Sequence, residues 1–273
     1  MQQEELTWVL QSNAIGNDDQ LSLADCIQKS GHKVELIRVI PFIHEPADPL
    51  PKIEGPCVVY GSSGLVKLGH KANWFPCGWD GETFELDTVN QSLGELALNF
   101  EAIKTVWSKA WQIASANNWD LVFVRPVSET KEFPGKVFNI NQLREWAEKL
   151  EHSGYFETND NPAMIGPAVK LGREWRVFVV HEQQVTGCEY ANRGIPEAIT
   201  SLPSEVTDFV AQTLRVFTPA PCFVIDVAEV FSDSGSTLKV VEYNSINSSG
   251  FYACDKTAIV EELSKFALSN FGN

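Results

Sequence analysis

The first sixty residues alternate between two hydrophobic patterns, and this alternation restricts the fold more than any other feature. LTWVL (6–10) and HKVELIRV (32–39) have the short apolar runs typical of strands, while QLSLADCIQKS (20–30) has the spacing of a helix that stops at Gly31. A strand, a helix and a second strand predict two parallel strands joined by a crossover helix. PCVVYG at 56–61 adds another buried strand. We therefore expect an amino-terminal α/β domain built on a parallel sheet.

The composition is that of a globular protein, with 273 residues, 44% hydrophobic and 21% charged, enough for two modest cores. The formal net charge of −15 argues against broad contact with nucleic acid or anionic lipid, because such contacts need basic surface. No run of about 18 apolar residues occurs, and MQQEELTWVL lacks the regions of a signal peptide. We expect a soluble, cytoplasmic protein that acts on a small molecule, a peptide or a protein.

The six cysteines stand singly along the chain, with no CxxC pair and no histidine at zinc-ligand spacing. Free thiols in a reducing compartment are the expected state. No cysteine lies in a sequence context that indicates a nucleophile, and the histidines lie in polar contexts. Catalysis through a Cys-His or Ser-His-Asp arrangement is therefore not expected.

The pattern after the first sheet indicates a second unit, with a boundary near residue 97. Residues 1–97 are assigned to the amino-terminal domain and 98–273 to the second unit. LVFVRP at 121–126 is typical of a strand that ends at a proline. Apolar spacing predicts four helices, the last of them capped by Asp255: 95–116, 141–151, 204–217 and 256–268.

Two strand-like runs near the carboxyl terminus carry acidic and amide groups among apolar residues. CFVIDVAEVF (222–231) and TLKVVEYN (237–244) are joined by SDSGS, which predicts a hairpin. If its loop has three residues, Asp226 lies opposite Glu242. Asn244 then projects from the same face as Glu242, about 7 Å away.

Two carboxylates set opposite each other repel unless a cation lies between them. Oxygen ligands from Asp226, Glu242 and Asn244 suit Mg²⁺, which takes one or two carboxylates and completes its shell with water and nucleotide phosphates. The alternative is a half-solvated hairpin whose acids face water. A two-residue turn would shift the register by one and put the acids on opposite faces.

Four segments follow one another in the order found in the ATP-grasp superfamily of carboxylate–amine ligases, and each resembles a motif of that family: FVRPVSETKEFPGKVF, EWRVFVV, VIDVA and VVEYNSINSSGFYACD. The resemblance extends over roughly residues 56–256. The pattern is similar to that of a small clade of ATP-grasp proteins found in bacteria and phages, in which arginine stands where most members carry lysine. The resemblance implies an α/β and α+β fold, in which an amino-terminal α/β domain precedes two α+β lobes, 98–167 and 168–273, that clamp ATP.

The resemblance implies a role for Arg125 at the α and β phosphates of ATP. Arginine keeps its charge and makes forked contacts with phosphate, so its exchange for lysine is chemically coherent. The loop from Ser128 to Lys136 would cover the phosphates, with Lys131 and Lys136 as candidate contacts to the γ-phosphate. The alternative for this loop is an ordinary solvated segment.

The remaining nucleotide and metal contacts are also implied by position in the family's motifs. A hinge would meet adenine through its backbone, and Glu174 would accept hydrogen bonds from the ribose. Asp226, Glu242 and Asn244 would hold Mg²⁺. The hinge residues are Ala168, Val169 and Lys170.

Two arginines are candidates to stabilise the charge of the transferring phosphoryl group. Arg176 lies two residues from Glu174 and is expected to point into the same cleft, although an ordinary ion pair is the alternative. Arg193, in the turn YANRG, is the second candidate. The best-known peptide ligases of this fold carry an arginine two residues before the first metal aspartate, where this chain has Val224.

Asn247, Ser248 and Ser249 occupy the region in which related ligases bind the acyl acceptor, and turn capping is the alternative. The resemblance implies ATP-dependent, Mg²⁺-assisted formation of an amide bond between a carboxylate and an amine, through an acylphosphate. Two alternatives remain open: a phosphotransferase on the same scaffold, and a nucleotide-binding module without catalysis. Release of ADP and phosphate only with both an acid and an amine would separate ligation from these two.

Overall fold

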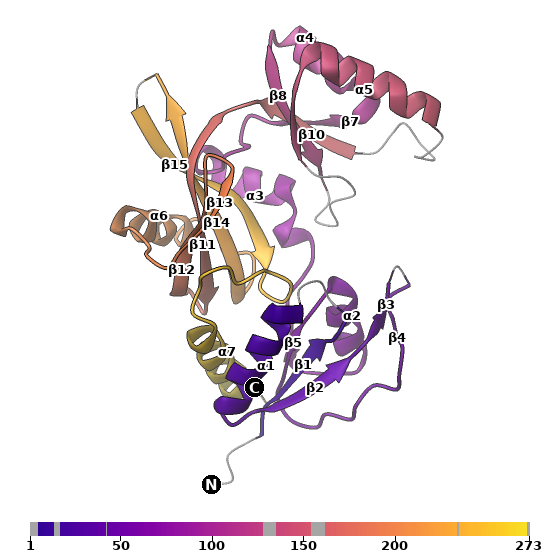
Figure 1. The fold of residues 1–273 in the computed structure, drawn as a ribbon, viewed down its shortest axis with the longest axis vertical. Coiled ribbons are helices and arrows are strands. Elements are labelled where there is room, and N and C mark those ends of the chain that lie inside the picture. The colour runs from indigo at the N-terminus through magenta and orange to yellow at the C-terminus, as the bar shows by residue number, and fades with distance from the viewer. Residues whose placement is uncertain are drawn as a thin grey trace.

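The computed structural model describes residues 5–13, 17–41, 43–127, 135–153, 162–233 and 235–271. Three main sheets follow one another along the long axis of the molecule (Figure 1). The sheet nearest the amino terminus lies at one end, a five-stranded sheet lies in the middle, and a second four-stranded sheet lies at the other end. The polar side chains of interest lie where the middle sheet meets the other two.

The first sheet is parallel, as the sequence pattern predicts, in the strand order β2-β1-β5-β6. Every residue of β1 is buried, because the strand is paired on both sides and covered by helices. Helix α1 makes the predicted crossover between β1 and β2. The elements of this part are β1 (Thr7–Gln11), α1 (Asn17–Lys29), β2 (Lys33–Ile37), β3 (Val39–Ile40), β4 (Glu45–Pro46), β5 (Cys57–Tyr60), α2 (Ser63–Lys71), β6 (Pro76–Cys77), η1 (Glu82–Phe84), α3 (Leu86–Leu93) and η2 (Gly94–Leu96).

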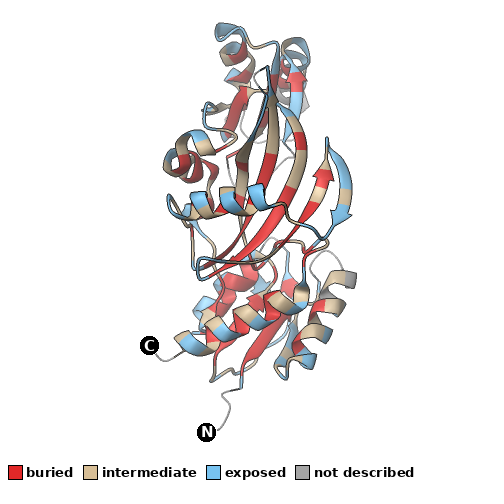
Figure 2. Cartoon of the chain, turned by 90° about the vertical axis from the view of Figure 1, so that its left-hand side faces the viewer, coloured by how far each residue is buried: buried red, intermediate tan, exposed pale blue. Residues whose placement is uncertain are grey.

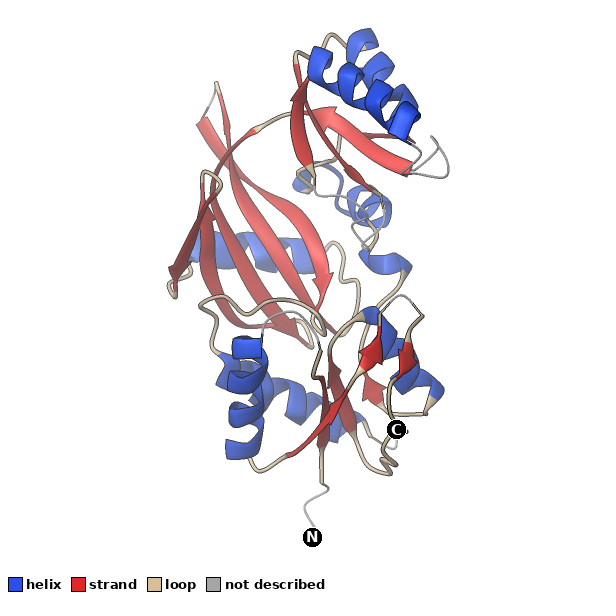
Figure 3. Cartoon of the chain, turned by 45° about the vertical axis from the view of Figure 1, so that its right-hand side comes forward, coloured by secondary structure: helices blue, strands red, loops and turns tan. Residues whose placement is uncertain are grey.

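The second four-stranded sheet is antiparallel, in the order β7-β10-β8-β9. Helices α4 and α5 cover one face, where Leu143 packs with Val122 and Val124 (Figure 3). Because side chains alternate along a strand, Arg125 projects from the other face. The elements are β7 (Ile103–Val106), η3 (Trp107–Lys109), α4 (Ala110–Ala116), β8 (Leu121–Pro126), β9 (Lys136–Asn139), α5 (Ile140–Ser153) and β10 (Pro162–Pro167).

The predicted helix over 95–116 is wrong. A strand, β7, occupies Ile103–Val106, and only Ala110–Ala116 forms an α-helix. Ile103 and Val106 pair with β10, so tertiary pairing decides the conformation of a segment whose apolar spacing also fits a helix. The other predicted helices are present, and Asp255 caps α7 by accepting hydrogen bonds from the backbone of Thr257 (2.9 Å).

The middle sheet is antiparallel in the order β13-β12-β11-β14-β15. Buried residues run along its long strands (Figure 2). On one face Val177 and Ile225 pack with Val206 and Val210 of α6. The elements are β11 (Lys170–Val180), β12 (Gln183–Asn192), β13 (Ile195–Ile199), α6 (Ser204–Leu214), β14 (Cys222–Ser232), β15 (Gly235–Ser245) and α7 (Lys256–Asn270).

The opposite face of the middle sheet changes character along its strands. Phe178 and Val224 pack into the core that also contains Trp8 of β1. Two residues further along the same strands, Arg176 and Asp226 project from this face. The face is therefore apolar where the first sheet covers it and charged where that cover ends.

Helix α7 joins the first and middle sheets through this shared core, in which its residues Ile259 and Leu263 pack beside Trp8 and Ile27. The indole Nε1 of Trp8 donates a hydrogen bond to Ser264 Oγ (3.2 Å). The first sheet is thus covered in part by a helix from the far end of the sequence. The proposed division of the chain near residue 97 remains a prediction.

Candidate functional site

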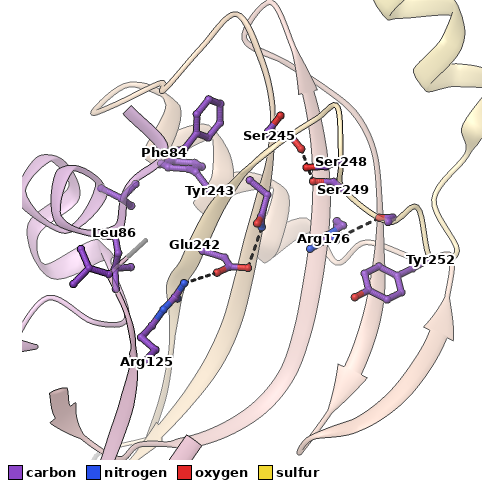
Figure 4. A pocket seen from close by; sticks show the side chains of 14 residues that line it. Phe84, Leu86, Arg125, Arg176, Glu242, Tyr243, Ser245, Ser248, Ser249 and Tyr252 are labelled. Atoms are coloured by element: carbon purple, nitrogen blue, oxygen red, sulfur yellow. Dashed lines mark hydrogen bonds and ion pairs between the residues drawn. The ribbon is translucent and has the colours of Figure 1, made fainter. Parts of the chain in front are cut away.

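A cleft of about 370 Å³ lies between the second sheet, the middle sheet and the segment η1–α3 (Figure 4). Its size falls within the range of small-molecule sites. It brings together residues from β8, β11 and β15 and from the turn after β15. The predicted site residues that line it are Arg125, Arg176, Glu242, Asn244, Ser248 and Ser249.

The hairpin places Asp226 opposite Glu242, as predicted, although the register arises in another way. The turn has two residues rather than three, since Ser232 pairs with Gly235. A bulge at Val241 then shifts the ladder by one residue between Val227 and Asp226. The bulge compensates for the shorter turn and returns both acids to one face.

The three predicted metal ligands converge. Asn244 Nδ2 donates hydrogen bonds to Asp226 Oδ2 (3.1 Å) and Glu242 Oε1 (3.2 Å). The amide group therefore lies between the two carboxylates. The segment avoids the desolvation cost of unpaired polar groups, because each of the three side chains has partners.

Arg176 and Asp226 form a buried, bidentate ion pair. Arg176 Nε and Nη2 donate to the two oxygens of Asp226 at 2.8 and 2.7 Å, and Nη1 donates to the carbonyl of Gly250 at 3.0 Å. The two residues are direct partners across β11 and β14 and are 8% and 2% exposed. Burial lowers the pKa of Arg176, but attraction and hydrogen bonding by Asp226 outweigh it and raise the pKa above its ordinary value. Arg176 lines the cleft and also neutralises the carboxylate beside it.

Arg125 reaches across from the second sheet to the middle sheet. Its Nη2 donates to Glu242 Oε2 at 3.1 Å, and the two side chains are only 12% and 17% exposed. Gly135 lies close to Phe123 and Arg125, where a Cβ would collide with the Phe123 ring. The second sheet thus supplies a cation directly above the acidic hairpin.

Two tyrosines that the sequence did not single out surround the guanidinium of Arg176. Its Cζ lies 5.7 Å from the ring centroid of Tyr190 and 4.9 Å from that of Tyr252, and the two rings stack at 4.9 Å. Tyr190 Oη donates to Glu174 Oε2 at 3.0 Å. Burial raises the pKa of Glu174, and this hydrogen bond partly opposes it. Tyr252 stands inside the quoted carboxyl-terminal motif, but nothing in the pattern showed that it would reach Arg176.

The turn after β15 divides into framework and cleft residues. Asn247 does not line the cleft: its Nδ2 donates to the Val59 carbonyl (2.8 Å), and its Oδ1 accepts from the Trp79 backbone (2.8 Å). Its amide packs so closely on Gly78 that a Cβ there would collide with it. Asn247 therefore ties the first sheet to the middle sheet, and this framework role takes up both ends of the amide. Exposed Ser248 and buried Ser249 border the cleft.

Other predicted site residues lie away from this cleft. Arg193 is exposed and borders a separate hollow with Glu197 and Phe231, because the β12–β13 turn carries it beyond the sheet. Lys136 is exposed, with Nζ 5.3 Å from the Phe138 ring centroid.

The predicted hinge connects β10 to β11. The Ala168 backbone donates to Leu121 (3.0 Å), Val169 is 43% exposed, and Lys170 Nζ lies 5.8 Å from the Phe231 ring centroid. Lys131 lies outside the described residues.

The donor chemistry of the hairpin fits a hard divalent cation. Two carboxylates and one carboxamide carry the kinds of oxygen that Mg²⁺ favours, and Asn244 Nδ2 lies within hydrogen-bond distance of both acids, so this amide would turn its Oδ1 inward to bind the ion. Among the described residues no cluster of three or more His, Cys, Asp or Glu side chains forms a metal site, since the third group here is the amide of Asn244. The described part of the chain also contains no helix long and apolar enough to span a membrane.

Solved structures that resemble this chain share one architecture, the ATP-grasp fold. The RimK-domain ATP-grasp protein of Sphaerobacter thermophilus aligns with a TM-score of 0.64 at 13% identity, covering 96% of this chain and 99% of that one. The D-alanine–D-alanine ligase of Bacillus anthracis complexed with ATP gives 0.61 at 13% identity, covering 98% of each. The macrocyclase MdnC of Microcystis aeruginosa, bound with the precursor peptide MdnA, gives 0.57 at 14% identity, covering 95% and 99%.

A family model matches residues 62–263, which is most of the chain. The model describes an ATP-grasp domain, family 3 of its clade, and the protein belongs to this family. This confirms the resemblance to the ATP-grasp superfamily and the fold class expected from the sequence. A search of curated proteins found no significant relative.

Proposed function

We propose that the protein is an ATP-dependent carboxylate–amine ligase. The observation that carries the proposal is the contact between Arg125 of the second sheet and Glu242 of the middle sheet, inside a cleft that also holds Arg176 and Asn244. A cation from the second sheet, facing a second cation and a carboxylate–amide set on the middle sheet, suits a triphosphate clamped between the two sheets. The family and the ATP-bound ligase of the same fold support ATP as the nucleotide.

The chain's residues act by positioning and by neutralising charge. Arg125 would make a forked contact with phosphate oxygens, and Arg176 would offset charge on the transferring group. Asp226, Glu242 and Asn244 would hold Mg²⁺, which supplies further neutralisation of the phosphates when bound. Because Asp226 holds Arg176 through two hydrogen bonds, that guanidinium is already oriented before substrate arrives.

The proposed reaction moves the γ-phosphoryl group from ATP to an oxygen of the substrate carboxylate, which gives ADP and an acylphosphate. The lone pair of an amine then attacks the acyl carbon, phosphate leaves, and the amine loses a proton. No nucleophilic side chain takes part. The protein excludes water from the acylphosphate by keeping it in a cleft enclosed by both sheets.

Hydroxylamine tests this proposal without knowledge of the natural amine, because it attacks an acylphosphate to give a hydroxamate. We expect ADP, phosphate and hydroxamate to appear together when the full-length protein is given ATP, magnesium, hydroxylamine and a panel of carboxylic acids. Release of ADP with a phosphorylated product that hydroxylamine does not trap would support the phosphotransferase instead. ATP binding with no turnover on any acid would support a non-catalytic module.

A further inference from the structure

The cleft runs along the outer edge of a sheet. β15 is the last strand in the order β13-β12-β11-β14-β15, so one side of its backbone has no neighbouring strand, within the described part of the chain, beyond a single bridge between Ala97 and Val240. The next residues of this edge, Glu242 to Ser245, all line the cleft. An uncovered edge carries backbone donors and acceptors that an extended peptide can pair with.

The wall facing this edge is apolar. Phe84, Leu86 and Val89 of the η1–α3 segment line the cleft, each at most 4% exposed, and none of their side chains offers a hydrogen bond. Figure 4 shows Phe84 and Leu86 at this wall. A buried polar group on this wall would lose its water without gaining a partner, whereas an apolar side chain would gain from burial.

The charges of the cleft indicate which end of a peptide it takes. The basic side chains that line it, among the residues that the structure describes, are Arg125 and Arg176. These guanidinium groups are paired with Glu242 and Asp226, but each has five N–H donors, so donors remain for a terminal carboxylate beside the nucleotide phosphates. A volume of about 370 Å³ admits the end of a chain rather than a folded surface.

We infer that the carboxylate substrate is the carboxyl-terminal end of an extended peptide whose last side chain is apolar. This inference rests on the proposed ligase function and adds the substrate class. The peptide backbone lies along β15, its final side chain packs on Phe84, Leu86 and Val89, and its carboxylate lies toward the arginines.

A set of free-acid probes tests the inference on the unaltered protein: Ala-Ala-Leu, Ala-Ala-Glu, Ala-Ala-Lys and free leucine, each with ATP, magnesium and hydroxylamine. We expect kcat/KM for hydroxamate formation to be at least about 10-fold higher for Ala-Ala-Leu than for the other three. Ala-Ala-Leu amide, which has no carboxylate, should give none. Equal or faster reaction of Ala-Ala-Glu, Ala-Ala-Lys or leucine keeps the ligase but overturns the peptide-end inference. No hydroxamate from any acid contradicts ligation itself.

Val89 is 1% exposed and packs with Phe84 in the core behind the cleft, so Val89→Thr, which keeps the shape of valine and adds a hydroxyl, changes the wall from its buried side. We expect KM for Ala-Ala-Leu to rise about 5- to 10-fold, while KM for ATP changes far less. An equal rise in both values would indicate a general loss of structure and contradict a substrate-facing wall.

Two buried cysteines lie next to Arg176, which lines the cleft. Cys188 and Cys254 lie with their Sγ atoms 3.1 Å apart, both buried and both free thiols. Cys188 is the β12 partner of Arg176, and Cys254 Sγ lies 3.8 Å from the Arg176 carbonyl. The hydrogen bond from Cys254 is the main cause that lowers the pKa of Cys188, to about 7.

We propose that Cys188 and Cys254 are a modification site that closes to an intramolecular disulfide. With hydrogen peroxide as oxidant, the two thiols lose two protons and two electrons, the S–S bond forms, and the O–O bond breaks to give two waters. The sulfurs must approach by about 1 Å to reach the S–S bond length. This would draw the turn that carries Gly250 and Tyr252, both in contact with Arg176, toward β12.

Mass spectrometry after peroxide treatment and alkylation under denaturing conditions tests the second proposal. We expect a 188–254 crosslink with the other four cysteines alkylated, and a reversible loss of ATP turnover of about 10-fold or more. Cys188→Ser should abolish the crosslink, whereas Cys222→Ser, also buried, should keep it. Alkylation of all six thiols, or sulfinic acid on Cys188 without a crosslink, would overturn the site. A crosslinked protein with full turnover would overturn its effect on the cleft.

Discussion

Asp226→Asn is expected to lower the free energy of unfolding by about 3–5 kcal/mol, because it leaves the buried guanidinium of Arg176 without its charged partner. The pair is bidentate and almost fully buried, so water cannot replace the lost carboxylate. Urea unfolding of the two proteins, followed by tryptophan fluorescence, measures the difference.

The matched control is an exposed ion pair. Glu148→Gln removes the partner of Arg144 on helix α5, where both side chains are more than half exposed, and should cost less than about 1 kcal/mol. The double variant Arg176→Met, Asp226→Leu should recover much of the loss, since apolar residues of similar volume need no charged partner. A loss for Asp226→Asn no larger than for Glu148→Gln would show that water reaches this pair.

Glu242→Gln is expected to lower ATP turnover by about 10³-fold or more, the second large effect. The substitution keeps the shape of the side chain but removes the charge that faces Arg125 and that the proposed Mg²⁺ site needs. ADP release with a saturating acid and hydroxylamine measures the change.

Glu229→Gln on the neighbouring strand is the control for this substitution. Glu229 borders the separate hollow near Arg193, outside the cleft, so turnover should stay within about 2-fold of the parent. Thermal unfolding should show that Glu242→Gln remains folded. Turnover of Glu242→Gln near that of Glu229→Gln would remove Glu242 from the reaction and defeat the metal assignment.

The carboxyl-terminal hairpin shows how much of the site could be predicted from the sequence. Its apolar runs located both strands, and alternation placed Asp226, Glu242 and Asn244 on one face. The assumed three-residue turn was wrong, because neither the two-residue turn nor the bulge at Val241 has a clear signal in the sequence. The two deviations cancel, so the prediction of facing acids is confirmed.

Contacts between distant segments could not be predicted in the same way. The partner of Arg176 is 50 residues away, and its choice depends on the register between β11 and β14. The apolar wall was missed because the segment around Phe84 and Leu86 has no regular spacing to indicate what it faces. Cys188 and Cys254 look unrelated in the sequence for the same reason. Periodicity reports which face a residue occupies, but not what lies opposite.

Helix α7 has a consequence for how the protein is made. Trp8, Ile27 and Val58 belong to the first part synthesised, yet their core also includes Ile259 and Leu263, which leave the ribosome last among them. Contacts over such sequence separations slow folding, since long loops must close before burial rewards them. The part of the amino-terminal core that Ile259 and Leu263 cover should therefore remain open to chaperones and proteases until synthesis has passed α7, and a nascent chain halted before that helix would keep this part exposed.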